Sequence, residues 1–394
     1  MTDIDFLSVE TFDFSIVSWV ILGVLLFFFL VQILFYLLVY KKPASYEDRR
    51  EKVSVENDNW PSFSVVIASK NESENLSKHL PIILEQNYPN FEVIVVNMGS
   101  TDETDILLKS FDQKYPNLYH TYVPAGADDV NEKKLALTLG IKAANNDILL
   151  FTEAYCEASS GNWIREFAKE FANGKEIVLG YCKLVIDKKV SMREFILYDN
   201  MIHALKYLSM AIFRKPFMGI GRNLAYKKEI FFEEKGFSSV LNIEGGEDDL
   251  FINKIAKKKK IGVAISPDSM TQTGVVEKFT TWRALKSKYL YTKQFYKGFS
   301  SFVFWLDTFS KYFFLLAAIS GMAFGIYSHN YILFSLSILL IVARFSIQLN
   351  VMNKNARLFG VDKLHVNLFF YDIFHPFNNL KFRKYANRRN KFKR

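Results

Sequence analysis

The chain has 394 residues, of which 50% are hydrophobic and 38 are phenylalanine, and its formal net charge is +9. This length allows one sizeable domain together with membrane segments, and the phenylalanine content is high for a purely soluble protein. Only two cysteines occur, Cys156 and Cys182. That number argues against a disulfide-stabilised fold and indicates a reducing compartment for the central domain.

The N-terminal apolar segment covers residues 16–40 and is followed directly by Lys41, Lys42 and Pro43. It exceeds the roughly 20 residues that a membrane-spanning helix needs. A cleaved signal peptide begins with basic residues, whereas the residues before this segment are acidic. We therefore expect residues 1–43 to be an uncleaved transmembrane anchor, with the N-terminus outside and Lys41 in the cytoplasm.

Residues 44–61 are mostly polar or charged, and we interpret them as a linker. Beyond them, short apolar segments alternate with segments of helical length. The strand candidates are residues 63–68, 91–97, 118–123 and 147–152, and the helices predicted between them are residues 75–86, 102–115 and 132–144. Such alternation predicts an α/β domain over residues 62–300, with a mostly parallel sheet and flanking helices.

Two more apolar segments, residues 312–327 and 331–349, are separated by only three polar residues. This spacing predicts a transmembrane hairpin over residues 301–350, with residues 302–309 extending the short first arm. Arg344 lies near the cytoplasmic end of the second arm. We expect its long side chain to reach the lipid head groups.

Residues 351–394 are predicted to form an interfacial segment and a basic cytoplasmic tail. Residues 364–377 are rich in aromatic side chains, and they suit an interfacial helix or a segment packed against the hairpin equally well. Residues 381–394 contain eight basic residues and no acidic one. Because membrane segments lie nearby, we expect this tail to bind anionic lipids rather than nucleic acid, although a solvated tail is a simpler interpretation.

An acidic residue follows the last strand candidate of the α/β domain. The carboxyl end of an apolar strand is where an open α/β sheet usually presents its chemistry. Two carboxylates at positions i and i+2 there could hold a divalent cation and, through it, a diphosphate. Here Glu153 occupies the first position and Tyr155 the second. A phenol is a poor ligand for Mg²⁺ or Mn²⁺, since it has to ionise from a reference pKa of about 10.

Five segments of the domain, taken in order, resemble those of one known family. The segments are residues 63–72, 93–102, 131–140, 152–156 and 245–251. Together they resemble the membrane-bound, inverting family 2 glycosyltransferases of the GT-A fold, over about residues 60–295. The resemblance implies a nucleotide-diphospho-sugar transferase-like sheet, with transmembrane helices at both ends of the chain.

The resemblance assigns the first segments to the nucleotide-sugar donor. In that family the end of the first strand holds the base and ribose, and a lysine on a later helix lies under the donor. Asn97 and Met98 stand where the family has two aspartates. Capping of the helix that follows is a simpler explanation for Asn71 and Asp102. The predicted donor-binding residues are Ser69, Asn71, Glu72, Asn97, Lys133, Glu153 and Lys288.

Two motifs of the family are altered in this chain. Glu153 and Tyr155 replace the two aspartates of its Asp-x-Asp motif, so the implied Mg or Mn cation has one candidate ligand within the motif, Glu153. Glu157, two residues beyond Tyr155, is a candidate replacement for the missing ligand. Its Gln-x-x-Arg-Trp motif becomes Leu285, Lys288 and Tyr289. Lysine keeps a charge for the diphosphate but loses the bidentate fork of arginine.

Three consecutive acids, Glu247, Asp248 and Asp249, follow two glycines at the start of a helical stretch. Helix polarity alone can explain acids at this position. The resemblance instead gives Asp248, beside Glu247, the catalytic role of general base for the acceptor hydroxyl. Aromatic packing is an alternative role for the one tryptophan among the acceptor candidates. The predicted acceptor-binding residues are Arg222, Asn223, Trp282 and Tyr289.

Two functions remain open at this point. The first is a glycosyltransferase of the inner or plasma membrane that moves a sugar from a nucleotide-sugar donor to a lipid-linked or polysaccharide acceptor. The second is a degenerate transferase that serves as a non-catalytic binding or scaffold subunit in cell-envelope glycan synthesis. The second draws on a pattern, because the altered residues at 97–98, 153–155 and 285–289 all fall on the donor and diphosphate side.

Overall fold

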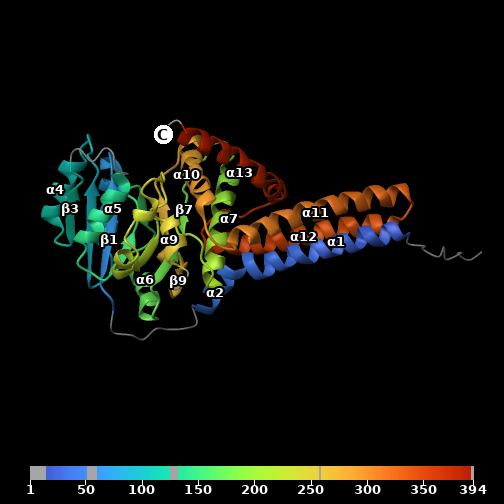
Figure 1. Cartoon of the computed structure of the whole chain (residues 1–394), viewed down its shortest axis with the longest axis horizontal. Coiled ribbons are helices and arrows are strands. Elements are labelled where there is room, and N and C mark those ends of the chain that lie inside the picture. The colour runs from blue at the N-terminus through green and yellow to red at the C-terminus, as the bar shows by residue number, and fades with distance from the viewer. Residues whose placement is uncertain (1–14, 51–59, 125–131, 257–258, 392–394) are drawn as a thin grey trace, which may run out of the picture. The chain divides into compact units, whose positions relative to one another are not determined.

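The computed structural model describes residues 15–50, 60–124, 132–256 and 259–391 (Figure 1). The chain forms two compact units. The helical unit comprises Met1–Leu38 with Ser301–Val351, and the α/β unit comprises Val39–Ser300 with Met352–Arg394. The acidic residues that precede the first apolar segment, and the last three residues of the basic tail, lie outside the described residues.

A seven-stranded sheet forms the centre of the α/β unit. Its strands, in spatial order, are β3 (Leu118–Tyr122), β2 (Phe91–Asn97), β1 (Phe63–Ser69), β4 (Ile148–Phe151), β8 (Leu224–Lys227), β6 (Ile177–Gly180) and β9 (Ile261–Ala264). Only β8 runs antiparallel to its neighbours β4 and β6. The predicted mostly parallel sheet is therefore confirmed, and the four predicted strands agree with the structure to within one residue at each end.

Helices cover both faces of this sheet, which is why β1 is apolar and buried along its whole length. Residues of α3 (Ser73–Leu84) and α6 (Trp163–Ala172) share one core with the side chains of Val65 and Val93. The other face carries α5 (Glu132–Ala143). Gly140 lets α5 approach closely, because a Cβ there would lie 2.6 Å from Cγ1 of Val66.

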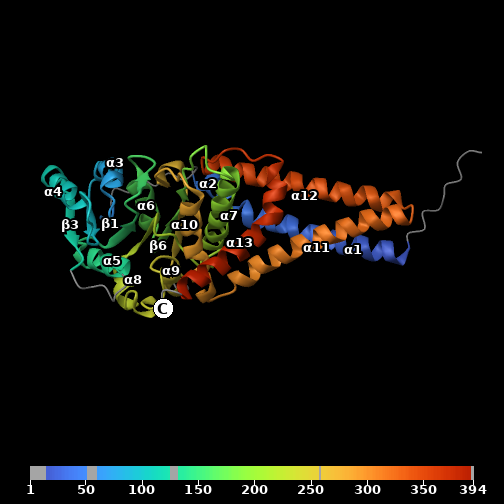
Figure 2. The same cartoon turned by 90° about the horizontal axis from the view of Figure 1, so that it is seen from above.

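The remaining elements of the α/β unit surround this sheet (Figure 2). A small second sheet has the order β5 (Cys156–Ala158), β10 (Thr271–Thr273) and β7 (Cys182–Lys183). The other helices are α2 (Lys42–Arg50), α4 (Thr104–Lys114), α7 (Arg193–Ile212), α8 (Lys228–Glu233), α9 (Asp249–Ile255), α10 (Phe279–Thr292) and α13 (Asn367–Lys391). Short 3₁₀ turns occur at Ser238–Val240, Pro267–Ser269 and Lys293–Phe295.

The linker prediction is wrong for its first part, since α2 is a helix. Its residues are polar but include good helix formers, and the helix packs against α7. Lys354 also forms an ion pair with Asp48 of α2 at 2.5 Å. The rest of the predicted linker, residues 51–59, lies outside the described residues.

The C-terminal segment also differs from expectation. Residues 367–391 form one helix, α13, which continues through Pro376. It packs against α7 and α10 of its own unit, with Phe382 against Trp282 and His375 bonded to Asp199. Neither of the two interpretations of residues 364–377 included this packing.

Among the described residues, three helices are long and apolar enough to span a membrane. They are α1 (Ile16–Leu34), which continues into a π-helical turn at Phe35–Tyr40, α11 (Ser300–Tyr327) and α12 (Tyr331–Leu358). Residues 302–309 belong to the same helix as the rest of the first hairpin arm, as expected. Within the helical unit, Phe28 and Phe29 of α1 contact Phe313 and Phe314 of α11.

Arg344 does not reach outward as predicted. Its side chain is only 3% exposed, because α1 and α12 supply polar partners inside the helical unit. The guanidinium donates to Oε1 of Gln32 at 2.8 Å and to the hydroxyl of Tyr36 at 3.2 Å. Gln32 in turn donates to the hydroxyl of Ser310 on α11. The arginine thus links helices instead of contacting head groups.

Candidate active site

The first donor-side residues lie at the ends of β1 and β2. Ser69 pairs with Asn97 across the two parallel strands, and the buried hydroxyl of Ser69 has no hydrogen-bond partner among the described residues. Oδ1 of Asn97 accepts from the backbone N–H of Ser100 at 2.9 Å, and Oδ1 of Asn71 accepts from that of Thr101 at 2.8 Å. Asn71 therefore links the two loops, and Asn97 stabilises the turn that follows its own strand.

Two acids next to these loops have different roles. Asp102 accepts from the backbone N–H of Thr104 and of Ser73, the first residues of α4 and α3. These hydrogen bonds hold the pKa of Asp102 well below its usual range, and the largest effect comes from Thr104. Asp102 is therefore a structural residue, as expected. Burial raises the pKa of Glu72, which also accepts from the side-chain amide of Asn75.

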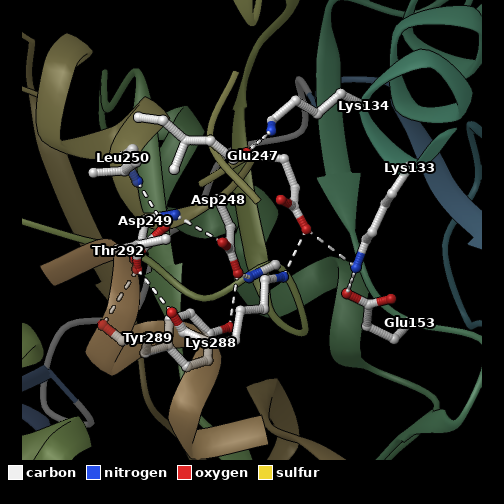
Figure 3. A network of polar contacts seen from close by, with 12 residues as sticks. Lys133, Lys134, Glu153, Glu247, Asp248, Asp249, Leu250, Lys288, Tyr289 and Thr292 are labelled. Carbon is white, nitrogen blue, oxygen red and sulfur yellow. Dashed lines mark hydrogen bonds and ion pairs between the residues drawn. The ribbon is translucent and has the colours of Figure 1, made fainter. Parts of the chain in front are cut away.

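A network of lysines and carboxylates joins four elements at the centre of the unit (Figure 3). Lys133 of α5 lies 2.5 Å from Oε1 of Glu153, after β4, and 3.4 Å from Oε1 of Glu247. Lys288 of α10 contacts the same Oε1 at 2.6 Å. Burial alone would raise the pKa of Glu247, but Lys288 and Lys133 outweigh it and hold that pKa well below its usual range. Glu247 and both lysines are therefore charged at neutral pH.

Lys134, the neighbour of Lys133, donates to the backbone of another segment. It is buried, and it donates to the backbone carbonyl of Ile243 at 2.5 Å. Burial lowers its pKa. Of the two adjacent lysines, Lys133 is the one whose side chain forms an ion pair with Glu153.

Asp248 lies beside this network and caps the N-terminus of α9. Its Oδ2 accepts from the backbone N–H of Gly221 at 2.8 Å and from the hydroxyl of Tyr289 at 2.7 Å. Its Oδ1 accepts from the N–H of Asp249 at 2.9 Å. Three donors from three segments therefore fix the orientation of this carboxylate. A cavity, here called the Asp248 cleft, is lined by Ala68, Lys133, Thr152, Glu153, Glu247 and Asp248.

The third acid of the run, Asp249, points elsewhere. It is fully buried and accepts from the hydroxyls of Thr292 and Tyr296, which lie at and just after the end of α10. Burial and the neighbouring Asp248 raise its pKa to about 7. Sequence reasoning gave Asp249 no role of its own. Its role is to connect α9 to the end of α10, on which Lys288 and Tyr289 are carried.

The backbone turn before these acids requires glycine. Gly245 and Gly246 have φ angles of +80° and +86°, values that side chains other than glycine adopt at a cost. The turn brings Glu247 toward the lysines and Asp248 toward Gly221. The glycine pair noted in the sequence therefore has a conformational reason.

The chain is similar to known proteins in both sequence and fold. Residues 64–233 match the family model described as glycosyl transferase family 2. Over these residues the α/β unit is therefore similar to family 2 glycosyltransferases, and it is here called the family 2 domain. It is 34% identical over 98 residues to glycosyltransferase AglE of Haloferax volcanii, which covers 24% of this chain and 31% of that protein.

A second curated relative is poly-beta-1,6-N-acetyl-D-glucosamine synthase of Staphylococcus epidermidis, with 29% identity over 132 residues, 32% of this chain and 29% of that protein. The chain thus spans about a third of the length of the relatives it matches. Among solved structures, the mannosyltransferase PcManGT from Pyrobaculum calidifontis, in complex with GDP-Man and Mn²⁺, superimposes with a TM-score of 0.51 at 17% identity, covering 84% of this chain and 98% of that one. This likeness supports the GT-A fold.

Among the described residues of the family 2 domain, the acids near the cleft do not form a carboxylate set that fits a divalent cation. Glu153 is bonded to Lys133, and burial raises the pKa of the Tyr155 phenol well above its usual value, so the phenol stays protonated. Glu157 is engaged by His79 at 3.1 Å and by Gln272. Within the described ranges, no three or more His, Cys, Asp or Glu side chains lie together as metal ligands would. These residues do not fit Mg²⁺ or Mn²⁺.

Two of the predicted acceptor residues of the family 2 domain are structural. Asn223 is buried, and its amide is fully used: it accepts from Nε1 of Trp163 and donates to the carbonyls of Tyr181 and Ser269. The prediction for Asn223 is therefore wrong, because no polar group is left for an acceptor. The buried ring of Trp282 packs edge-on against Phe382 and other aromatic rings. That position favours the packing alternative over sugar stacking.

The other two acceptor candidates remain in place. The hydroxyl of Tyr289 reaches Asp248 directly, and Arg222 lies next to Gly221, whose N–H donates to the same carboxylate. A Cβ at Gly221 would lie 3.3 Å from Oδ2 of Asp248, so glycine permits this close approach. No feature of the sequence predicted that the Tyr289 hydroxyl would orient the acid.

Proposed function

We propose that the family 2 domain transfers a sugar from a nucleotide diphosphate to an acceptor hydroxyl with inversion. The single observation that carries this proposal is the position of Asp248, which lines one cavity together with Lys133 and Glu153 and is held by three hydrogen bonds. A carboxylate so oriented suits a general base.

The proposed reaction is one in-line displacement. The acceptor oxygen attacks the anomeric carbon while its proton passes to Asp248, and the bond from that carbon to the diphosphate oxygen breaks. A single displacement inverts the anomeric centre. Lys133 and Lys288 neutralise the charge of the leaving diphosphate, and this suits a cleft whose acids do not fit a metal.

For the diphosphate to bind, both lysines must exchange partners, and the Asp248 cleft, whose volume is about 20 Å³, must open. In the structure Lys133 and Lys288 are paired with Glu153 and Glu247. Because these pairs occupy the lysines, a non-catalytic binding subunit is the second candidate function. Nucleotide binding separates the two, since only a transferase needs the lysines to release their carboxylates.

We further infer a membrane location from the three long apolar helices. In the proposed arrangement, residues 1–43 form an anchor with the N-terminus outside, and residues 62–300 form the cytoplasmic catalytic domain. Residues 301–350 form the hairpin, and the basic end of residues 351–394 binds anionic lipids in the cytoplasm. The acceptor is a lipid-linked sugar or a growing polysaccharide, and the donor a UDP- or GDP-sugar.

The test uses the purified full chain in detergent, titrated calorimetrically with UDP and with GDP, each with and without Mn²⁺. Binding of one nucleotide is expected, and the absence of binding under every condition would sink the proposal. Asp248→Asn should lower release of the nucleotide from its sugar by about 10²- to 10⁴-fold while affinity stays unchanged. Asp105→Asn, on the exposed side of α4, is the matched control and should behave as the wild type.

A further inference from the structure

A second cavity lies directly behind the Asp248 cleft. It is lined by residues of α7 and α10 together with Cys182, Ile220 and Arg222, and is here called the Arg222 cavity. The two cavities meet at one stretch of chain, because Gly221 lines the first and its neighbours line the second. Tyr289 belongs to the wall between them: its ring lines the Arg222 cavity, and its hydroxyl donates to Asp248.

Arg222 carries an uncompensated charge into this cavity. The side chain is only 6% exposed, and its Nε and Nη1 have no hydrogen-bond partner within the described part of the chain. The ionisable groups that influence it most are two thiols and two phenols, those of Cys182, Tyr289, Tyr155 and Cys156. A buried cation without a partner is costly, and folded proteins rarely retain one.

The position of Arg222 is well defined even though its guanidinium is unpaired. Its backbone carbonyl accepts from the hydroxyls of Thr152, at 3.2 Å, and Thr271, at 2.9 Å. These bonds hold the residue between β4 and the small sheet. The backbone from which the guanidinium extends is therefore fixed.

The other charges around the cavity cancel. Asp199 forms an ion pair with Lys286 and accepts from His375 at 2.9 Å. Burial lowers the pKa of His203 to about 3, so this imidazole is neutral at neutral pH. With the Cys182 thiol protonated, Arg222 leaves the cavity with a net charge of +1. The charge of Arg222 also acts on the thiol of Cys182. Burial raises the pKa of this thiol, but the hydrogen bond with Cys156 and the charge of Arg222 outweigh burial and lower the pKa to about 7.

The size of the cavity limits what it can hold. Its volume is about 40 Å³, whereas one water molecule needs roughly 10–15 Å³ by this measure. A carboxylate or phosphate group fits such a space, but a whole sugar ring does not. The ligand is therefore an anionic substituent whose remaining part lies outside the cavity.

We propose that Arg222 binds a carboxylate or phosphate group carried by the acceptor, and so selects an anionic acceptor and holds its hydroxyl near Asp248. This inference rests on the proposed function, because it needs Asp248 to be the base. The lining favours the acceptor over the donor diphosphate, since Lys133, Glu153 and Lys288 do not line this cavity. Planar, bidentate recognition is the chemistry that arginine supplies to both kinds of anion.

The experiment compares the full-length wild type with Arg222→Met and Arg222→Lys in detergent at constant ionic strength. The probes are glucuronate and inorganic phosphate for the acceptor anion, glucose as the neutral control, and UDP for the donor. Calorimetry should detect binding of at least one anion to the wild type. Arg222→Met should weaken that binding roughly 10- to 100-fold, with the affinity for UDP unchanged. Arg222→Lys should be intermediate, because it keeps the charge without the fork.

A merely structural role predicts the opposite effect on stability. Removal of an unpaired buried charge should raise the melting temperature of Arg222→Met, whereas removal of a structural anchor should lower it. The proposal is overturned if neither anion binds the wild type, or if Arg222→Met binds them equally well. A loss of UDP affinity instead would assign Arg222 to the donor diphosphate and also overturn it. Failure of the proposed function is distinct, because it appears as absent nucleotide binding in the wild type.

Discussion

Replacement of Lys288 by methionine tests whether the network of lysines and carboxylates binds the donor. The change removes the 2.6 Å contact to Glu247 and leaves Lys133 at 3.4 Å. Because Coulomb energy falls inversely with distance, the remaining contact has about three quarters of the strength of the lost one. Breaking a buried ion pair completely costs about 3–5 kcal/mol. With the remaining partner, we expect a loss of about 2 kcal/mol in the free energy of unfolding.

The same substitution should also weaken binding of the nucleotide, which is measured separately from stability. A charge-assisted contact to a diphosphate contributes about 1.5–3 kcal/mol, so the affinity of Lys288→Met for UDP or GDP should fall about 10- to 150-fold. Lys288→Arg restores the charge and adds the fork of the family motif, and should bind at least as well as the wild type. Titration calorimetry on the full chain measures both.

A matched control removes a lysine outside the cleft. Lys254 of α9 pairs with Glu234 at 3.2 Å and is about one third exposed, so Lys254→Met should leave nucleotide affinity unchanged. If Lys288→Met binds nucleotide as tightly as the wild type, the network of lysines and carboxylates is a structural feature of the fold. The donor assignment of Lys288 would then be refuted.

Chelation of divalent cations should leave nucleotide affinity within about twofold, since the protonated Tyr155 and the paired Glu153 do not supply a metal site; a much larger loss of affinity in EDTA would contradict this. The folding stability should also depend on pH through Asp249, whose pKa is raised from 3.8 to about 7. The folded state holds this proton between about pH 4 and 7 while the unfolded state does not, so the free energy of unfolding should fall by about 1.4 kcal/mol per unit as the pH rises through that window, and level off above it. Asp249→Asn should remove this slope in denaturant unfolding measured at pH 5 and pH 8, and an unchanged slope would show that another group titrates.

Local pattern was enough to predict much of the fold. Each of the strands β1 to β4 is a short apolar segment followed by a polar turn, and burial on both faces makes such a segment recognisable without its neighbours. The carboxyl ends of parallel strands share one sheet edge, so Ser69, Asn97 and Glu153 could be assigned to one side of the domain from their positions in the chain. Resemblance to family 2 supplied Asp248 and Lys133.

The errors fall where partners come from distant parts of the chain. Arg344 looked like a residue that reaches the head groups, but Gln32, more than 300 positions away, gives it a buried partner. Asn223 looked like a binding residue until Trp163 and two carbonyls used its amide. The helix α2 looked like a linker, because packing against α7 leaves no local signal.

The sequence by itself determined which groups are available: an α/β sheet, three apolar helices, and acids, lysines and an arginine in the order of a family 2 domain. Only the tertiary structure decided what each group does. Glu247, Asp248 and Asp249 are adjacent and chemically alike, yet one pairs with lysines, one faces the cleft and one is buried against α10. The physical reason is that the charge state and orientation of a side chain depend on its burial and its partners. For these residues the partners are Lys133, Lys288, Tyr289 and Thr292, brought together by packing rather than by sequence proximity.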